Sequence, residues 1–212
     1  MSFKAQINVL DEYASLLSKH CSLLNDELND SLKTWPEAFA FILVESHYMQ
    51  KNRIECNFKH LEYLYENYQE DQKEYLYEII CDGTGNYPLS SILVEFISKT
   101  KEIESQFKSL SEFVKLFGNA SEFASFIHSI NSAITKKQAL RVSYKFGFDF
   151  YWPSHKLMSN LGRLGLTTKF FDIDRYQFIV SYVSSKSGLD KYFVHKKLNS
   201  YLSSKNITSS LL

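Results

Sequence analysis

Two stretches of the chain place apolar residues at alternating steps of three and four, and this pattern restricts the fold more than any other feature. The first stretch consists of Phe3, Ile7, Leu10, Ala14, Leu17, Cys21, Leu24 and Leu28. The second, within about 89–117, consists of Leu93, Phe96, Thr100, Ile103, Phe107, Leu110, Val114 and Phe117. The spacing predicts long helices that either dimerise as coiled coils or pack inside one bundle. The bundle is favoured, because an apolar stripe on a helix usually faces the core of its own chain.

Capping signals mark two further helices in the same part of the chain. Thr34, with Pro36 in the first turn and Glu37 three residues on, predicts a helix start, and residues 38–44 are apolar all round, as in a buried helix. Gly118 ends the preceding helix, and Asn119 with Glu122 starts another that runs to about 135. Residues 1–135 therefore read as a helical bundle.

A predicted helix over about 55–80 carries glutamates at every fourth residue, with tyrosines among them. Such a stripe is either a solvated face beside a core face or a surface that docks a basic partner. The candidate protein-binding residues are Glu62, Glu66, Glu70 and Glu74.

The hydrophobic period changes near residue 139. Residues 140–150 alternate apolar and polar side chains, which is typical of a half-buried strand. A helix follows from Ser154, residues 169–173 and 176–183 predict a hairpin, and a last helix covers about 188–203. The fold class is thus mainly α, with a small α+β module of strand, helix, hairpin and helix at 136–212.

Charge follows the same division. The net charge of the 212 residues is zero, yet residues 1–135 sum to −9 and residues 136–212 to +9. This asymmetry indicates a nucleic-acid or other polyanionic partner for the basic module. The alternative is that the acidic and basic parts attract each other within the molecule.

The basic module resembles a winged helix, in which a helix reads the major groove and a two-stranded wing touches the backbone. The missing preceding helix and the long strand 140–150 depart from that pattern, so another small α+β module stays open. Lysine and arginine can hold phosphates, and asparagine can read base edges. The candidate nucleic-acid-binding residues are Lys156, Asn160, Arg163, Lys169 and Arg175; a plain lysine-rich surface would need no partner.

Catalytic signatures are sparse. The chain has no GxSxG or HExxH motif and no CxxC pair, so neither a metal nor a cofactor is expected, and an enzyme is the less favoured class. Arg53 and His60, six residues apart, are similar to the R-x4–6-H signature of HEPN-type ribonucleases, although Ile54 stands where that family often has a polar residue. The resemblance implies metal-independent RNA cleavage at a dimer interface, with His60 in acid–base chemistry and Arg53 stabilising phosphate charge.

The expected location is the cytoplasm. The N-terminus lacks an export signal, and the longest apolar stretch, 38–44, is far shorter than the ~20 residues needed to cross a bilayer. Three widely spaced cysteines suit a reducing compartment. The excess of lysine over arginine, twenty to four, favours an AT-rich coding sequence of bacterial or phage origin.

Three functional hypotheses follow. The first is a non-enzymatic binding or regulatory protein whose helical body mediates assembly, through a protein partner or a homodimer, and whose basic end touches nucleic acid. Its layout looks like that of accessory subunits of DNA-processing or phage-defence complexes. The second is a protein-only interaction factor, such as an immunity protein or effector, that uses the acidic tyrosine-rich helix. The third is the HEPN-like ribonuclease.

Overall fold

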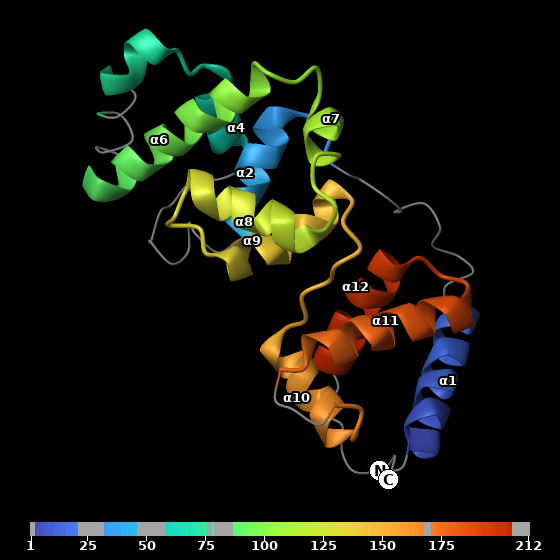
Figure 1. The fold of residues 1–212 in the computed structure, drawn as a ribbon. Coiled ribbons are helices and arrows are strands. Elements are labelled where there is room, and N and C mark those ends of the chain that lie inside the picture. Colours follow the sequence, from blue (N-terminus) through green and yellow to red (C-terminus); the bar gives the residue numbers. More distant parts are fainter. Residues whose placement is uncertain are drawn as a thin grey trace. The chain divides into compact units, whose positions relative to one another are not determined.

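The computed structural model describes residues 3–20, 32–45, 58–75, 78, 87–167 and 171–204. The chain divides into two compact units. Unit 1 combines residues 1–30 with 150–212, and unit 2 consists of residues 31–149. The N-terminal helix therefore belongs with the C-terminal helices, and the middle of the chain builds a separate unit (Figure 1).

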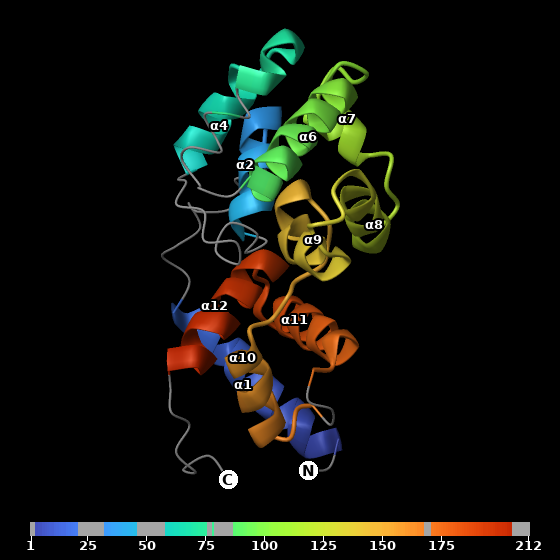
Figure 2. The same ribbon diagram turned by 90° about the vertical axis from the view of Figure 1, so that its left-hand side faces the viewer.

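Unit 2 is a set of helices that pack around α2 (Trp35–Glu45). Helix α2 contacts α4, α6 and α9, and α8 packs along α9 (Figure 2). The elements after α2 are α4 (Phe58–Glu66), the 3-10 helix η2 (Glu70–Gln72), α6 (Tyr87–Glu104), α7 (Leu110–Val114), α8 (Ala120–Ile130), α9 (Lys136–Val142) and the 3-10 helix η3 (Ser143–Phe146).

The capping signals identify the starts of α2 and α8. The backbone N–H of Glu37 donates to the Thr34 hydroxyl, and that of Thr34 donates to the Glu37 carboxylate. The Asn119 side chain accepts from the N–H groups of Ser121 and Glu122 in the same way. Both predictions are confirmed, and residues 38–43 of α2 are all buried, as their all-round apolarity predicts.

The long helix predicted over 89–117 is interrupted. Helix α6 ends at Glu104, and α7 begins at Leu110 with the Ser109 hydroxyl as its cap. The apolar stripe nevertheless continues across the break, because Phe107 and Phe117 still pack against the buried core of unit 2. The stripe therefore identifies the core-facing residues correctly but misses the bend.

Unit 1 contains α1 (Phe3–His20), α10 (His155–Arg163), α11 (Ile173–Ser187) and α12 (Lys191–Ser204). Helix α11 contacts α1 and α12, and α12 also contacts α10 (Figure 1). The first heptad stripe is buried at Leu10, Ala14 and Leu17, so in the described part α1 packs within its own chain. The rest of that stripe, Cys21 onward, lies outside the described residues.

The predicted α+β module is wrong, because the described residues contain no strand. Of residues 140–150, expected as a strand, the first three form the end of α9 and the next four form η3. Residues 176–183, expected as one strand of the hairpin, lie within helix α11. In each segment the buried residues follow the helical spacing i, i+3, i+4 and i+7. They are Ala139, Val142, Ser143 and Phe146 in the first segment, and Tyr176, Ile179, Val180 and Val183 in the second. The winged-helix-like hairpin is therefore absent from the described residues.

The packing also redistributes charge. Unit 1 joins the acidic residues 1–30 to the basic residues 150–212 and holds eleven basic and eight acidic side chains, while unit 2 holds thirteen and sixteen. The net charge is −9 for residues 1–135 and +9 for residues 136–212, but it is only +3 for unit 1 and −3 for unit 2. Lys136, where the charge changes sign along the sequence, is the first residue of α9 inside unit 2.

Candidate functional site

A three-residue turn, Gly188 to Asp190, joins α11 to α12. Gly188 has φ +72°, a left-handed conformation that glycine adopts without a steric penalty. Its N–H donates to the Ser184 carbonyl at 2.9 Å, and the Asp190 carboxylate accepts from the N–H of Tyr192 at 2.8 Å. Two helices joined by a short turn that contains glycine occur both in helical hairpins and in helix-turn-helix motifs.

A buried polar pair lies where α11 meets α12. The Tyr176 hydroxyl and His195 Nδ1 are hydrogen-bonded at 2.7 Å, and the Tyr151 ring lies 5.3 Å from the imidazole. Burial lowers the pKa of His195 to about 4 and raises the pKa of Tyr176. His195 is therefore uncharged at neutral pH. Both side chains are buried, so the pair joins two helices and does not face a substrate.

The outward face of α12 carries two aromatic–lysine pairs at i, i+4 spacing. Val194, His195 and Leu198 form the buried side of the helix, and Tyr192, Phe193 and Lys197, which lie away from that side, are half-buried. Lys196 is exposed, and Lys197 Nζ lies 5.3 Å from the centre of the Phe193 ring. No acidic residue occurs in α12.

Helix α10, which contacts α12, also carries basic side chains. Lys156 and Arg163 lie exposed on α10, and neither makes a hydrogen bond or an ion pair to the described residues. Helix α10 also contains no Asp or Glu. We call Lys156, Arg163, Tyr192, Phe193, Lys196 and Lys197 the basic face of unit 1.

The other three predicted nucleic-acid-binding residues are placed differently. Asn160 is 5% exposed, on the buried side of α10. Arg175 donates from Nε to the Leu166 carbonyl at 3.1 Å and from a terminal nitrogen to Gln6 Oε1 at 2.8 Å, with its guanidinium 4.8 Å from the Phe178 ring centre. It thereby links α1 to α11. Lys169 lies outside the described residues.

Sequence reasoning missed α12 as the centre of this surface. The signal was present, because Gly188 followed by Asp190 is a helix stop and a helix cap in succession. The predicted hairpin obscured it: with residues 176–183 read as a strand, the two helices on either side of the turn were not recognised as a pair.

The glutamate stripe does not lie on one helix. Helix α4 ends at Glu66, Glu70 belongs to η2, and Glu74 follows it, so only Glu62 and Glu66 share α4. The Glu70 carboxylate accepts from the hydroxyls of Tyr68 at 2.6 Å and Ser98 at 3.1 Å, and these bonds hold its pKa below the ordinary value. Glu70 therefore links η2 to α6 although it is exposed, and Glu66 and Glu74 are exposed as well.

The proposed ribonuclease pair is described only in part. His60 is exposed on α4, and Arg53 lies outside the described residues, as do Cys21, Cys56 and Cys81. Within the part of the chain that the structure describes, no three His, Cys, Asp or Glu side chains are grouped to hold a metal ion. None of the described helices combines the length and apolarity that a bilayer span requires.

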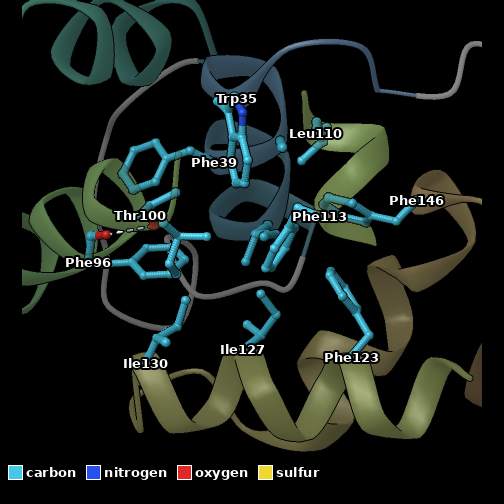
Figure 3. A pocket seen from close by; sticks show the side chains of 13 residues that line it. Trp35, Phe39, Phe96, Thr100, Leu110, Phe113, Phe123, Ile127, Ile130 and Phe146 are labelled. Carbon is cyan, nitrogen blue, oxygen red and sulfur yellow. Dashed lines mark hydrogen bonds between the residues drawn. The ribbon is translucent and has the colours of Figure 1, made fainter. Parts of the chain in front are cut away.

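A small apolar cavity lies inside unit 2 (Figure 3). Its volume is about 20 Å³, room for roughly one water molecule. The hydroxyl of Thr100, one of its lining residues, already donates to the Phe96 carbonyl of its own helix at 2.7 Å. Aromatic rings such as Trp35, Phe113 and Phe123 form the wall, and no charged side chain does. The cavity is thus a packing gap that lacks acid–base groups.

Comparison with protein-family models, with curated proteins and with solved structures gave no match.

Proposed function

We propose that unit 1 binds duplex DNA, with α12 in the major groove and α11 against the backbone. The observation that carries the proposal is the three-residue turn that joins α11 to α12, where α12 and its neighbour α10 carry basic side chains and no acidic ones. In DNA-binding helix-turn-helix proteins the second helix enters the groove.

The chemistry of the basic face fits this role. Lys196 and Lys197 would contact phosphates, while the rings of Tyr192 and Phe193, one turn earlier in α12, would lie against base edges and thymine methyl groups. Lys156 and Arg163 on α10 would add backbone contacts. Phosphate contacts of this kind release condensed counterions, so the affinity is expected to fall steeply with salt.

The wider proposal is a cytoplasmic regulatory or accessory subunit, bacterial or phage in origin, that is not an enzyme. Unit 1 would touch nucleic acid, and unit 2 would mediate assembly with a protein partner or a second copy of the chain.

The test is fluorescence anisotropy of the full chain with a labelled duplex over a salt series. We expect the double charge reversal Lys196→Glu with Lys197→Glu to weaken binding and to lower the salt slope by about two, roughly one per lost phosphate contact. The matched control is Lys108→Glu with Lys136→Glu, two exposed lysines of unit 2. Circular dichroism checks that each variant is folded. Unchanged binding by the folded Lys196/Lys197 variant, or no binding by the wild type at low salt, would contradict the proposal.

A protein-binding surface on α4 and η2 is the second candidate. Tyr63 and Tyr75 are 62% and 61% exposed, and the exposed carboxylates of Glu66 and Glu74 lie close to them in the chain. Exposed tyrosines beside carboxylates suit a basic protein partner, because tyrosine is enriched at interfaces. We expect a labelled lysine-rich peptide to bind the wild type, and Tyr63→Ser with Tyr75→Ser to remove that binding. Equal binding by a folded double variant would exclude this surface.

A further inference from the structure

A row of side chains at steps of four runs along α11, the helix that packs on α1 and α12 (Figure 1). The row consists of Asp174, Phe178, Tyr182 and Lys186. Asp174, Phe178 and Lys186 are exposed, with Phe178 at 40%, and Tyr182 is half-buried. Side chains at i and i+4 are neighbours on a helix, so the four residues form one continuous ridge. We call this row the α11 ridge.

Contacts within unit 1 hold the two rings of the α11 ridge in place. The ring centres of Phe178 and Tyr182 lie 5.9 Å apart, and the Arg175 guanidinium lies 4.8 Å from the centre of the Phe178 ring. The Tyr182 hydroxyl donates to the Asp11 carboxylate on α1 at 2.8 Å. Because both rings already have fixed neighbours, little side-chain freedom remains to be lost when a partner packs on them.

The two ends of the α11 ridge carry opposite charges. The Asp174 carboxylate makes no hydrogen bond or ion pair to the described residues. The Lys186 ammonium lies 5.7 Å from the centre of the Tyr182 ring and has no carboxylate partner in the described part of the chain. The two positions are about 18 Å apart along the helix axis, at 1.5 Å per residue, so they cannot pair with each other within one helix.

The spacing of the α11 ridge is symmetric about the level of Val180. Phe178 and Tyr182 lie two residues from this level, on either side of it, and Asp174 and Lys186 lie six residues from it. A twofold axis at this level would bring Asp174 of one copy opposite Lys186 of a second copy, and Phe178 opposite Tyr182. Ridges of this kind interdigitate when two helices cross at about −50°. The α11 ridge is therefore complementary to itself, as the interface of a twofold dimer must be.

We propose that two copies of this chain associate through their α11 ridges, antiparallel about a twofold axis. The rings of Phe178 and Tyr182 form the centre of the contact, and Asp174 of each copy pairs with Lys186 of the other. The charges identify the partner, because opposite charges at equal distances from an aromatic centre match a second copy of the same ridge. Aromatic side chains in the centre and charged ones at the rim are typical of protein interfaces.

This inference goes beyond the proposed function and does not depend on it. The α11 ridge shares no residue with the basic face of unit 1, so dimerisation and DNA binding can fail separately. Self-association is assigned to unit 1, which leaves unit 2 to a different protein partner.

Sedimentation velocity of the full chain, over a concentration series and without DNA, measures the dissociation constant of the dimer. We expect the wild type to show a monomer–dimer equilibrium. Phe178→Ser should raise the dissociation constant at least roughly tenfold, because it removes a ring from the centre of the contact. The control Leu116→Ser replaces an apolar residue of unit 2 that is 62% exposed, and it should dimerise as the wild type does.

Charge reversal at the two ends tests the antiparallel pairing. Asp174→Lys alone and Lys186→Glu alone each place like charges opposite each other, and each should raise the dissociation constant at least roughly tenfold. An equimolar mixture of the two variants should form a mixed dimer of about wild-type affinity, since every lysine of the pair then faces a carboxylate. A variant that had merely unfolded would not be rescued by mixing, and circular dichroism checks the fold of each.

Three results would overturn the proposal. The first is a wild type that stays monomeric throughout the concentration series. The second is an unchanged dimer in the folded Phe178→Ser variant, which would place the contact on another surface. The third is a mixture of the two charge-reversal variants that dimerises no better than either variant alone.

Discussion

The hydroxyl of Tyr176 lies 2.7 Å from Nδ1 of His195, within the buried contact between α11 and α12. This hydrogen bond connects the two helices of the proposed DNA-binding motif from the inside, while Gly188 connects them along the chain. The packing of α12 on α11 therefore depends on a histidine that must remain uncharged.

The stability of unit 1 is expected to fall in mild acid because of His195. Burial lowers its pKa from the ordinary 6.5 to about 4. Between these values the unfolded chain binds more protons than the folded chain, so this stabilisation is complete above pH 6.5. It is lost as the pH falls toward 4, by up to about 1.4 kcal/mol per pH unit.

Urea unfolding at a series of pH values between 7.5 and 4.5 measures this effect. His195→Gln should flatten the pH dependence, since glutamine does not titrate. The control His155→Gln replaces an exposed histidine of the same unit and should retain the wild-type dependence. Identical pH profiles for the wild type and His195→Gln would show that His195 titrates normally in the folded protein.

Gly188→Ala is expected to destabilise unit 1 by about 1–2 kcal/mol, because φ is +72° and a side chain there is strained. A Cβ at this position meets nothing within 4 Å, so the cost comes from the backbone alone. Gly162→Ala is the control: Gly162 lies in α10, where alanine should stabilise the helix by about 0.5–1 kcal/mol. Thermal unfolding compares the two, and opposite signs are the expected result.

Arg175 is expected to act through stability more than through DNA contact. Arg175→Lys removes the fork that donates to Leu166 and Gln6, and should cost roughly 1–3 kcal/mol. Arg163→Lys, at an exposed position without such bonds, should change the free energy of unfolding by less than about 0.5 kcal/mol. Equal urea midpoints for the two variants would contradict the structural role of Arg175.

Phe113 is expected to be a main support of the core of unit 2. Its ring lies 5.2–5.5 Å, between ring centres, from those of Trp35, Phe107, Phe117 and Phe126. Phe113→Ala should destabilise unit 2 by about 3–5 kcal/mol. Leu116→Ala, three residues away and 62% exposed, should have an effect below about 0.5 kcal/mol. Chemical denaturation followed by circular dichroism would contradict this ranking if both variants unfolded at the same midpoint.

Local sequence patterns predicted the structure correctly where a segment carried a single hydrophobic period or a single helix cap. The cap formed by Thr34 with Glu37 started α2, and Asn119 with Glu122 started α8, because such bonds involve residues only a few positions apart. The prediction of a strand from residue 139 onward was wrong because the apolar residues there fit both the period of a strand and the period of a helix. Val142 and Phe146 fit both strict alternation and a helical face, and Thr135 with Gln138 forms a capping box that starts α9.

By itself the sequence determined the helical character of the chain, its capped helix starts and the core-facing residues of its apolar stripes, since these depend on interactions between near neighbours. Tertiary structure alone decided that the N-terminal helix packs with the C-terminal ones. The hydrogen bonds of Gln6 with Arg175 and of Asp11 with Tyr182 join residues about 170 positions apart, and no local pattern encodes such a pairing. That pairing places α1, in which two lysines balance two acidic residues, against α11, while α10 and α12 carry the basic face of unit 1.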